Sequence, residues 1–263
     1  MDPAAELMDF DLATVEKLPV IARLLAEGGA PAEPCLDIGV GTGTTTRRLF
    51  AGRRTIALDA WRPNLAPLPA DELWRVQASG DRLPLADGSI GTILCSEVLE
   101  HVEDDVSLMR EMARVLKPGG VAVITVPSMY YGFDSYLHLV GIQTVHDFPG
   151  PERHVRPGYT EEQLGEMAHR SGLEVTRVEY VFGPCTKLAM EAVSLAHIVY
   201  QRAVHGRRSW SWADVAEPSV ASGAAFGVYR RLFPILRALG SLDRLLPTRG
   251  GFGLAMQARK PAR

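Results

Sequence analysis

The chain is poor in cysteine and carries almost no net charge. Only three of its 263 residues are cysteine, and they stand far apart at Cys35, Cys95 and Cys185. An odd number of cysteines without a Cys-x-x-Cys pair argues against a disulfide framework and against a structural zinc site. Lysine and arginine number 28 against 31 acidic residues, a formal net charge of −3, so the overall charge does not indicate a nucleic-acid partner.

The chain also lacks an apolar run long enough to cross a bilayer. The best candidate, residues 188–201, is interrupted by Glu191, whereas a transmembrane helix needs about 20 consecutive apolar residues. The first residues are acidic and do not show the basic-then-apolar order of a signal peptide. We therefore expect a cytoplasmic protein that does not span a membrane, with Cys35 and Cys95 as buried thiols.

The charge that is present is unevenly distributed. Residues 182–263 hold 12 lysines and arginines against 4 acidic residues, a net of +8. Residues 1–181 hold the remaining 16 against 27, a net of −11. The last third of the chain is thus a basic region attached to an acidic body.

Short apolar segments of β type alternate with segments of helical periodicity. The β-type segments cover residues 34–40, 54–60, 73–79, 92–96 and 121–127. Between the last two, residues 104–116 place Met109 and Met112 on one helical face, with Asp104 or Asp105 as the cap and Pro118-Gly119-Gly120 as the stop. This alternation predicts a parallel sheet with helices on both faces.

Both ends of the chain add further elements. The first 30 or so residues predict a helix that stops at Gly28-Gly29, and Thr160 to Gln163 form a capping box for a helix that ends near Ser171. Residues 173–181 and 251–260 are typical of two late strands joined by a long connection, which predicts an antiparallel edge hairpin. The predicted fold class is α/β, a doubly wound, mostly parallel sheet of seven strands with a helical insertion near the C-terminus.

The segment Cys35–Thr44 is the most informative motif. A short apolar strand containing Asp37 is followed by glycines at positions 39, 41 and 43 and then by the start of a helix. Glycine allows a sharp turn and lets a ligand approach the backbone closely. The dinucleotide-binding pattern G-x-G-x-x-G would place its third glycine at position 44, where this chain has threonine.

Four further motifs follow in order. Asp59 ends the next apolar run, where a carboxylate can accept two hydrogen bonds from a ribose diol. The other motifs are Gly80-Asp81-Arg82-Leu83-Pro84-Leu85, Cys95-Ser96-Glu97-Val98-Leu99-Glu100-His101-Val102 and Leu116-Lys117-Pro118-Gly119-Gly120.

Together these segments resemble the motifs of class I S-adenosylmethionine (SAM)-dependent methyltransferases, and among them the family that includes the ubiquinone and menaquinone methyltransferases. The resemblance covers roughly residues 33–128, with a weaker similarity at 154–181. It implies a Rossmann-like methyltransferase fold for a single domain over residues 1–263. Its parts would be an N-terminal helical region (1–32), a cofactor-binding core (33–181), a helical insertion (182–250) and a final edge strand (251–263).

The resemblance also implies a set of residues that bind SAM. The set is Asp37, Gly39, Gly41, Gly43, Asp59, Trp61, Asp81, Arg82, Ser96 and Glu97. The first four would shape the pocket for the methionine part, Asp59 would hold the ribose, and Trp61 would lie beside the adenine. Asp81 would accept from the adenine amino group and Arg82 would contact it through its backbone. Ser96 and Glu97 would lie near the sulfonium, where an acidic strand end suits a cation, although Glu97 could also be a solvated cap.

Three histidines are the candidate catalytic residues, because histidine titrates near neutrality and suits proton abstraction. They are His101, His146 and His154. His101 could equally cap or pack its helix. The other two, together with His138, belong to the irregular segment 128–158, which we expect to pass over the carboxyl ends of the strands. Tyr130, Tyr131 and Tyr136 are expected to line a pocket there.

Two classes of methyltransferase are disfavoured. No acidic cluster typical of metal-dependent catechol enzymes occurs, so no metal is expected. No Asp/Asn-Pro-Pro-Tyr run follows the fourth β-type segment, so an enzyme acting on flipped nucleic-acid bases, and with it a nucleic-acid partner, is not expected.

Residues 182–250 contain no motif of the family. Apolar residues at helical spacing are interleaved there with Arg230, Arg231, Arg237 and Arg244, and residues 207–212 are basic and aromatic. The segment could be a helical cap on the sheet with its arginines in water. It could also be a lid over an apolar acceptor, a contact with an anionic membrane surface, or a homodimer interface.

We therefore predict a SAM-dependent methyltransferase that moves a methyl group to an oxygen or carbon of a small, apolar or lipid-like acceptor by in-line displacement. The alternatives are a polar natural-product or sugar-type acceptor, a nicotinamide-dependent oxidoreductase, and a non-catalytic SAM-binding protein. Thr44 and the downstream motifs argue against the oxidoreductase.

Overall fold

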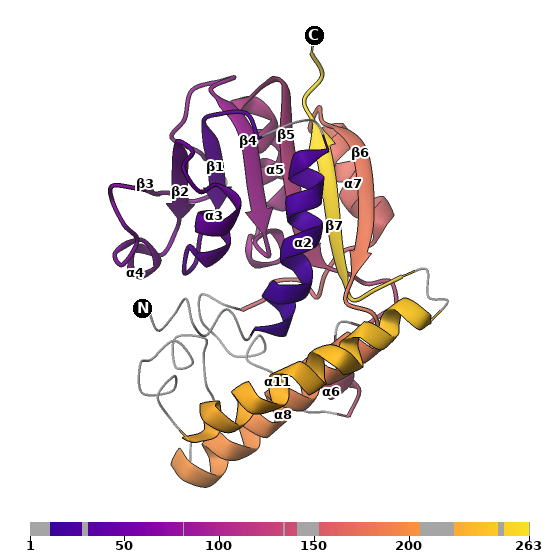
Figure 1. The fold of residues 1–263 in the computed structure, drawn as a ribbon. Coiled ribbons are helices and arrows are strands. Elements are labelled where there is room, and N and C mark those ends of the chain that lie inside the picture. The colour runs from indigo at the N-terminus through magenta and orange to yellow at the C-terminus, as the bar shows by residue number, and fades with distance from the viewer. Residues whose placement is uncertain are drawn as a thin grey trace.

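The fold is built on one seven-stranded sheet. The computed structural model describes residues 11–27, 31–80, 82–133, 135–140, 153–205, 224–246 and 250–262. The strands lie in the order β3-β2-β1-β4-β5-β7-β6 (Figure 1). This confirms the predicted α/β fold class.

The first five strands are parallel. β1 (Cys35–Ile38) lies between β2 (Thr55–Asp59) and β4 (Ile90–Ser96), β3 (Leu73–Gln77) pairs with β2, and β5 (Leu116–Pro127) pairs with β4. All five predicted apolar runs are therefore strands. The chain order reverses between β1 and β4, and in open α/β sheets ligands bind beyond the carboxyl ends of the strands at such a switch point.

The two late strands form the antiparallel edge that the sequence predicts. β7 (Gly253–Arg259) pairs with β5 on one side and with β6 (Glu174–Val181) on the other, both antiparallel. β7 is buried along nearly its whole length because it has a neighbour on each side, whereas β6 is the exposed edge. Gly253 pairs with both Pro127 and Val181, so the chain leaves β6 and returns to β7 at the carboxyl edge of β5.

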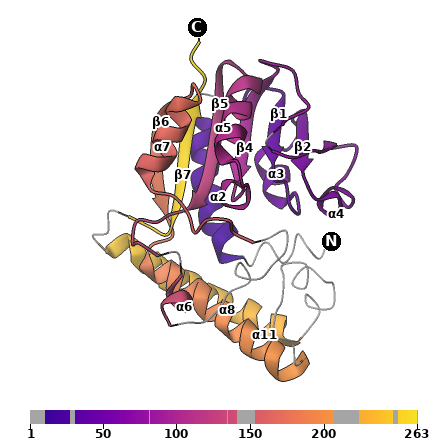
Figure 2. The same ribbon diagram turned by 180° about the vertical axis from the view of Figure 1, so that it is seen from behind.

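Helices cover both faces of the sheet (Figure 1, Figure 2). On one face lie α2 (Leu12–Ala26) and α3 (Thr44–Leu49), where Ile21 and Leu24 join a buried cluster with Cys35 and Leu94 of the strands. On the other face lie α5 (Asp105–Val115) and α7 (Glu161–Arg170), which pack on the alternate residues of the same strands. This two-sided burial follows from the period-2 geometry of a strand. The predicted capping box of α7 is present.

One predicted boundary differs from the structure. α5 ends at Val115, and residues 116–120, which include Pro118-Gly119-Gly120, form the irregular first part of β5 instead of the helix stop. The reason is Leu116, which is fully buried and pairs with Ile90 before the register shifts. The predicted stop at Gly28-Gly29 lies outside the described residues.

Beyond β6 the chain forms a pair of helices that we call the hairpin. It consists of α8 (Pro184–His205), α11 (Ala224–Ser241) and the short 3-10 helix η3 (Leu242–Leu245). Asp243 of η3 joins the two ends of the hairpin. Its carboxylate accepts hydrogen bonds from the backbone N–H groups of Cys185 (2.8 Å) and Thr186 (2.9 Å) at the start of α8. The hairpin lies along the carboxyl edge of the sheet (Figure 1, Figure 2).

Two further contacts hold the hairpin to the body. Leu12 at the start of α2 packs with Ala189 and Phe233 of the hairpin. Glu191, which is buried, accepts from the backbone N–H groups of Tyr136 and Leu137 at 2.9 Å each and so caps the short helix α6 (Tyr136–Leu139). The glutamate that interrupts the apolar run in the sequence therefore has a structural role.

Candidate active site

The glycine turn lies at the carboxyl end of β1, next to the switch point of the sheet. Gly39, Gly41 and Gly43 have φ values of +72°, +52° and +71°, a region that other residues rarely adopt. A Cβ on Gly39 would lie 2.4 Å from Cγ2 of Val98, and one on Gly43 would lie 2.5 Å from Cδ2 of Leu68. A Cβ on Gly41 would meet no atom within 4 Å. The outer two glycines therefore permit close packing, while Gly41 borders open space where a ligand could approach the backbone.

Asp37, in the strand that leads into this turn, connects β1 to the helix that follows the turn. Its side chain is buried and accepts a hydrogen bond from the hydroxyl of Thr46 in α3. Burial raises the pKa of Asp37 to about 7; the Thr46 hydrogen bond lowers it and the charge of Asp59 adds to the increase. Asp37 thus ties β1 to α3 and shapes the turn without reaching solvent.

Asp59 connects the glycine turn to the end of β2. Its carboxylate accepts from the backbone N–H of Gly41 (3.1 Å), from the backbone N–H of Trp61 (2.8 Å) and from the side-chain amide of Asn64 (3.0 Å). A carboxylate offers about four acceptor positions, so three internal donors leave room for another. The predicted bond to a ribose diol remains a prediction.

The next predicted residues lie around this edge. Trp61 is 41% exposed and directly precedes helix α4 (Arg62–Leu65), so its ring is accessible to a ligand. Arg82 is exposed, with its backbone N–H 3.4 Å from the carbonyl of Ser79. Asp81 lies outside the described residues.

Ser96 and Glu97 end β4 beside the switch point. The Ser96 hydroxyl lies 2.8 Å from that of Thr125, which donates to Glu97 Oε1 at 2.9 Å. Glu97 also forms an ion pair with Lys17 of α2 at 3.3 Å. Its φ of +56° is unusual for a residue with a side chain, and such strain is concentrated at functional sites. Glu97 is therefore a fixed, paired acid, in contrast to a freely solvated cap.

The structure brings two of the three predicted catalytic histidines together. His101 ends the 3-10 helix η1 (Leu99–His101), and its ring contacts that of His154 edge to face, with 4.7 Å between centroids. His101 Nδ1 lies 3.1 Å from the carbonyl oxygen of Arg153. His146 lies outside the described residues, and for His138 only the backbone is described.

Two residues of this region were not predicted as site residues. Glu100, next to His101, is fully buried, and neither of its carboxylate oxygens has a hydrogen-bond partner among the described residues. Burial, reinforced by the negative charge of Glu97, raises the pKa of Glu100 well above its usual range. Lys17, the partner of Glu97, is buried as well. A single lysine in a helix such as α2, or a single glutamate in a 3-10 turn such as η1, gives no sequence signal that it will be buried, so only the fold identifies them.

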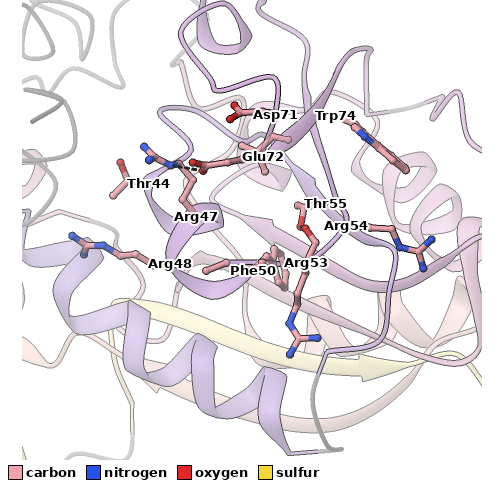
Figure 3. Close-up of a pocket in the computed structure, with 13 residues that line it drawn as sticks. Thr44, Arg47, Arg48, Phe50, Arg53, Arg54, Thr55, Asp71, Glu72 and Trp74 are labelled. Carbon is pink, nitrogen blue, oxygen red and sulfur yellow. Dashed lines mark hydrogen bonds and ion pairs between the residues drawn. The ribbon is translucent and has the colours of Figure 1, made fainter.

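A separate hollow of about 800 Å³ runs along α3 toward the amino ends of β2 and β3 (Figure 3). Its basic side chains include Arg47, Arg53 and Arg54, which are bonded to Glu72 (3.1 Å), the carbonyl of Pro31 (2.9 Å) and Glu33 (2.9 Å). The hollow contains none of the residues predicted to bind SAM, and these arginines are hydrogen-bonded to groups of the surrounding loops.

Comparisons with known proteins agree with this geometry. The methyltransferase domain family matches residues 36–124, which run from β1 into β5 and contain the glycine turn, Asp59, Ser96, Glu97 and the histidine at position 101. These residues therefore match a methyltransferase domain, and the fold is that of the class I SAM-dependent methyltransferases, for which SAM is the methyl donor.

Among curated proteins, an uncharacterised methyltransferase from Mycobacterium sp. strain KMS is 36% identical over 126 residues, which is 47% of this chain and 46% of that protein. A demethylmenaquinone methyltransferase from Mycolicibacterium vanbaalenii is 35% identical over 96 residues, 36% of this chain and 42% of that protein. The chain thus matches less than half the length of these relatives.

Solved structures share the fold over most of the chain. A SAM-dependent methyltransferase from Mesorhizobium loti superimposes with a TM-score of 0.55 at 20% identity, covering 94% of this chain and 99% of that one. A geranyl diphosphate methyltransferase in complex with GPP and sinefungin gives 0.54 at 14% identity, covering 93% and 78%. Within the part of the chain that the structure describes, no helix has the length and apolarity needed to cross a membrane.

Proposed function

We propose that this protein transfers the methyl group of SAM to an oxygen or carbon of a small, apolar, lipid-like acceptor. The observation that supports the acceptor class is an exposed apolar surface on the hairpin, which we call the hairpin face. Its members are Leu188, Leu195 and Val199 of α8 and Val228, Leu232, Ile235 and Leu239 of α11, each between 37% and 61% exposed. Seven exposed large apolar side chains on one pair of helices favour a binding role.

The hairpin face is placed where a bound acceptor could contact it. In α11 the four residues recur at steps of four and three, so they lie on one side of the helix. That side adjoins Tyr229 and Leu236, which pack with Leu12 of α2. Arg230 and Arg237 fall on the other side of the helix, because successive residues turn by about 100°. The apolar side therefore continues the surface that contacts the body.

Aromatic side chains add to the proposed acceptor region. Tyr131 stacks on Phe252 with ring centroids 4.7 Å apart, and Tyr136 and Phe133 contact the same ring at 5.2 and 5.5 Å. These residues follow β5 and precede β7 at the carboxyl edge of the sheet. Their rings provide apolar contact area at this edge, which supports an apolar acceptor.

The chemistry asks little of the protein beyond alignment. A sulfonium is already an activated methyl donor, so catalysis depends on an in-line approach of the acceptor and on exclusion of water. An oxygen acceptor must also lose its proton. His101 and His154 are the described histidines of the predicted catalytic set, and His146 remains a further candidate.

Isothermal titration with SAM, S-adenosylhomocysteine and NAD tests the cofactor, and we expect saturable binding of the first two alone. Transfer from labelled SAM to quinols and long-chain alcohols then tests the acceptor. Ile235→Asp should reduce turnover and leave S-adenosylhomocysteine affinity unchanged. Val175→Asp, on the exposed strand β6, is the matched control. A protein without affinity for either SAM or its product would refute the proposal.

A further inference from the structure

A row of side chains on α5 follows the loop between β3 and β4, which covers residues 78–89. Leu108, Glu111 and Arg114 stand three residues apart, so they lie on neighbouring turns on one side of the helix. A Cβ on Gly80 would lie 3.1 Å from Cδ1 of Leu108, so the loop passes close over the first member of the row. The other two members bind the later part of the loop through hydrogen bonds.

Arg114 makes most of these hydrogen bonds. Its guanidinium donates to the carbonyls of Leu83 (3.0 Å) and Leu85 (2.8 Å) and to the carboxylate of Asp87 (2.6 Å). It also donates to both carboxylate oxygens of Glu111, at 2.6 and 2.7 Å. An arginine has five N–H donors in one rigid fork, and each of them has an acceptor here. The guanidinium is therefore fully used in holding the loop and its partner on α5.

Glu111 holds the same part of the loop from its other side. Its Oε2 accepts the backbone N–H of Leu83 at 2.8 Å. Both backbone groups of Leu83 are thus bonded to α5, and its side chain is buried in the core. The backbone N–H of Gly88 adds a bond to the carbonyl of Arg114 at 3.0 Å. The loop is therefore attached to α5 at several points between residues 83 and 88.

The beginning of the loop is attached at the candidate cofactor site. The backbone N–H of Ala78 donates to the carbonyl of Asp59 at 3.2 Å. Residues 79–82 alone separate Ala78 from Leu83, and this span includes the two residues predicted to contact the adenine. A chain of this length has a limited reach, so its path depends on both attachments.

We propose that Glu111 and Arg114 are positioning residues for the adenine of SAM. They fix the loop at Leu83, directly after Asp81 and Arg82, the predicted adenine contacts. A binding group recognises its ligand well only when supporting bonds hold it to within about 0.5 Å of the productive position, and the pair on α5 supplies such bonds. This inference rests on the cofactor part of the proposed function and is independent of the acceptor.

Isothermal titration of the full chain with two ligands tests this role. They are S-adenosylhomocysteine and S-inosylhomocysteine, whose base carries an oxygen in place of the adenine amino group. We expect the parent to prefer the first ligand by about tenfold or more, because the second leaves an acceptor without its donor. Arg114→Lys keeps the charge but loses the planar fork, so both the affinity for S-adenosylhomocysteine and this preference should fall. Arg110→Lys, at an exposed position of α5, is the matched control and should bind both ligands as the parent does.

The preference for the amino group separates a positioning role from a purely structural one. If Arg114→Lys lowers the midpoint of urea unfolding but keeps the affinity and the preference of the parent, the proposal is refuted. A parent that binds both ligands equally would also refute it. If Arg114→Lys does not fold, Glu111→Gln decides by the same preference, which should again fall. A parent without affinity for S-adenosylhomocysteine would refute SAM binding itself, a result that differs from unchanged binding in the variants.

Discussion

The glycine turn gives the sharpest test of where the cofactor lies. Gly41 and Gly52 both have positive φ, +52° and +72°, and a Cβ on either would meet no protein atom within 4 Å. Alanine at each position should therefore cost about 1–2 kcal/mol of stability, the usual cost of the left-handed conformation for a residue with a Cβ. Gly52 lies in the turn before β2 and lines the separate hollow of Figure 3, so Gly52→Ala is a control for the backbone effect alone.

Gly39→Ala should be worse than either, because its methyl group would lie 2.4 Å from Val98. Overpacking of this kind adds about 1–3 kcal/mol to the backbone cost. The three variants would be compared by urea unfolding and by isothermal titration with S-adenosylhomocysteine. We expect Gly41→Ala and Gly52→Ala to be equally stable, but only Gly41→Ala to lose at least tenfold in affinity, about 1.4 kcal/mol. Equal affinities in these two would show that the cofactor does not pass over Gly41.

Three further predictions use the acidic residues of the site. Asp59→Asn keeps the shape but weakens hydrogen bonds to a charged acceptor, so it should lose about 2–4 kcal/mol in urea unfolding; a loss under 0.5 kcal/mol would contradict the bonding described. The pKa of Asp37 is about 7 in the folded protein and near 3.8 in the unfolded chain. The folded state therefore loses about 4 kcal/mol of stability as the pH rises from about 4 to 7, because the buried carboxyl must ionise. Asp37→Asn should flatten this part of the pH–stability profile, and an unchanged slope would contradict the raised pKa. Lys17→Met leaves Glu97 without its cation and should lower the free energy of unfolding by about 1–3 kcal/mol. This is less than for a fully buried ion pair, because Glu97 is partly exposed. The double variant with Glu97→Gln should recover part of that loss in urea unfolding.

Most of the fold could be predicted from the sequence because its strands are short apolar runs with clear turn residues between them. β1, β2 and β4 are buried on both faces, and this produces the continuous apolar pattern that is visible without a structure. The start of β5 was harder. Leu116 continues the apolar pattern of α5, yet it pairs with Ile90 in the sheet, and helical periodicity alone cannot distinguish these two positions.

Some residues of the candidate site could be predicted from the sequence and others could not. The glycines and Asp59 could be predicted because a positive φ or a strand-end acid demands a particular residue type at a fixed spacing. Glu100 and Lys17 could not, because their importance depends on burial between segments far apart in sequence. His154 was a candidate among three histidines of one irregular segment, and only the contacts of Val155 and Arg156 with η1 bring it to His101.

The cap that Asp243 forms on α8 also determines how the two ends of the hairpin are connected. Both helices of the hairpin meet at that one carboxylate. The Thr186 hydroxyl also donates to the carbonyl of Gly240 there, at 3.3 Å. The far ends of the two helices are more than a dozen residues from this clasp. Asp243 therefore joins the beginning of α8 to the end of the hairpin, and the bonds that Glu191 accepts from Tyr136 and Leu137 join α8 in turn to α6.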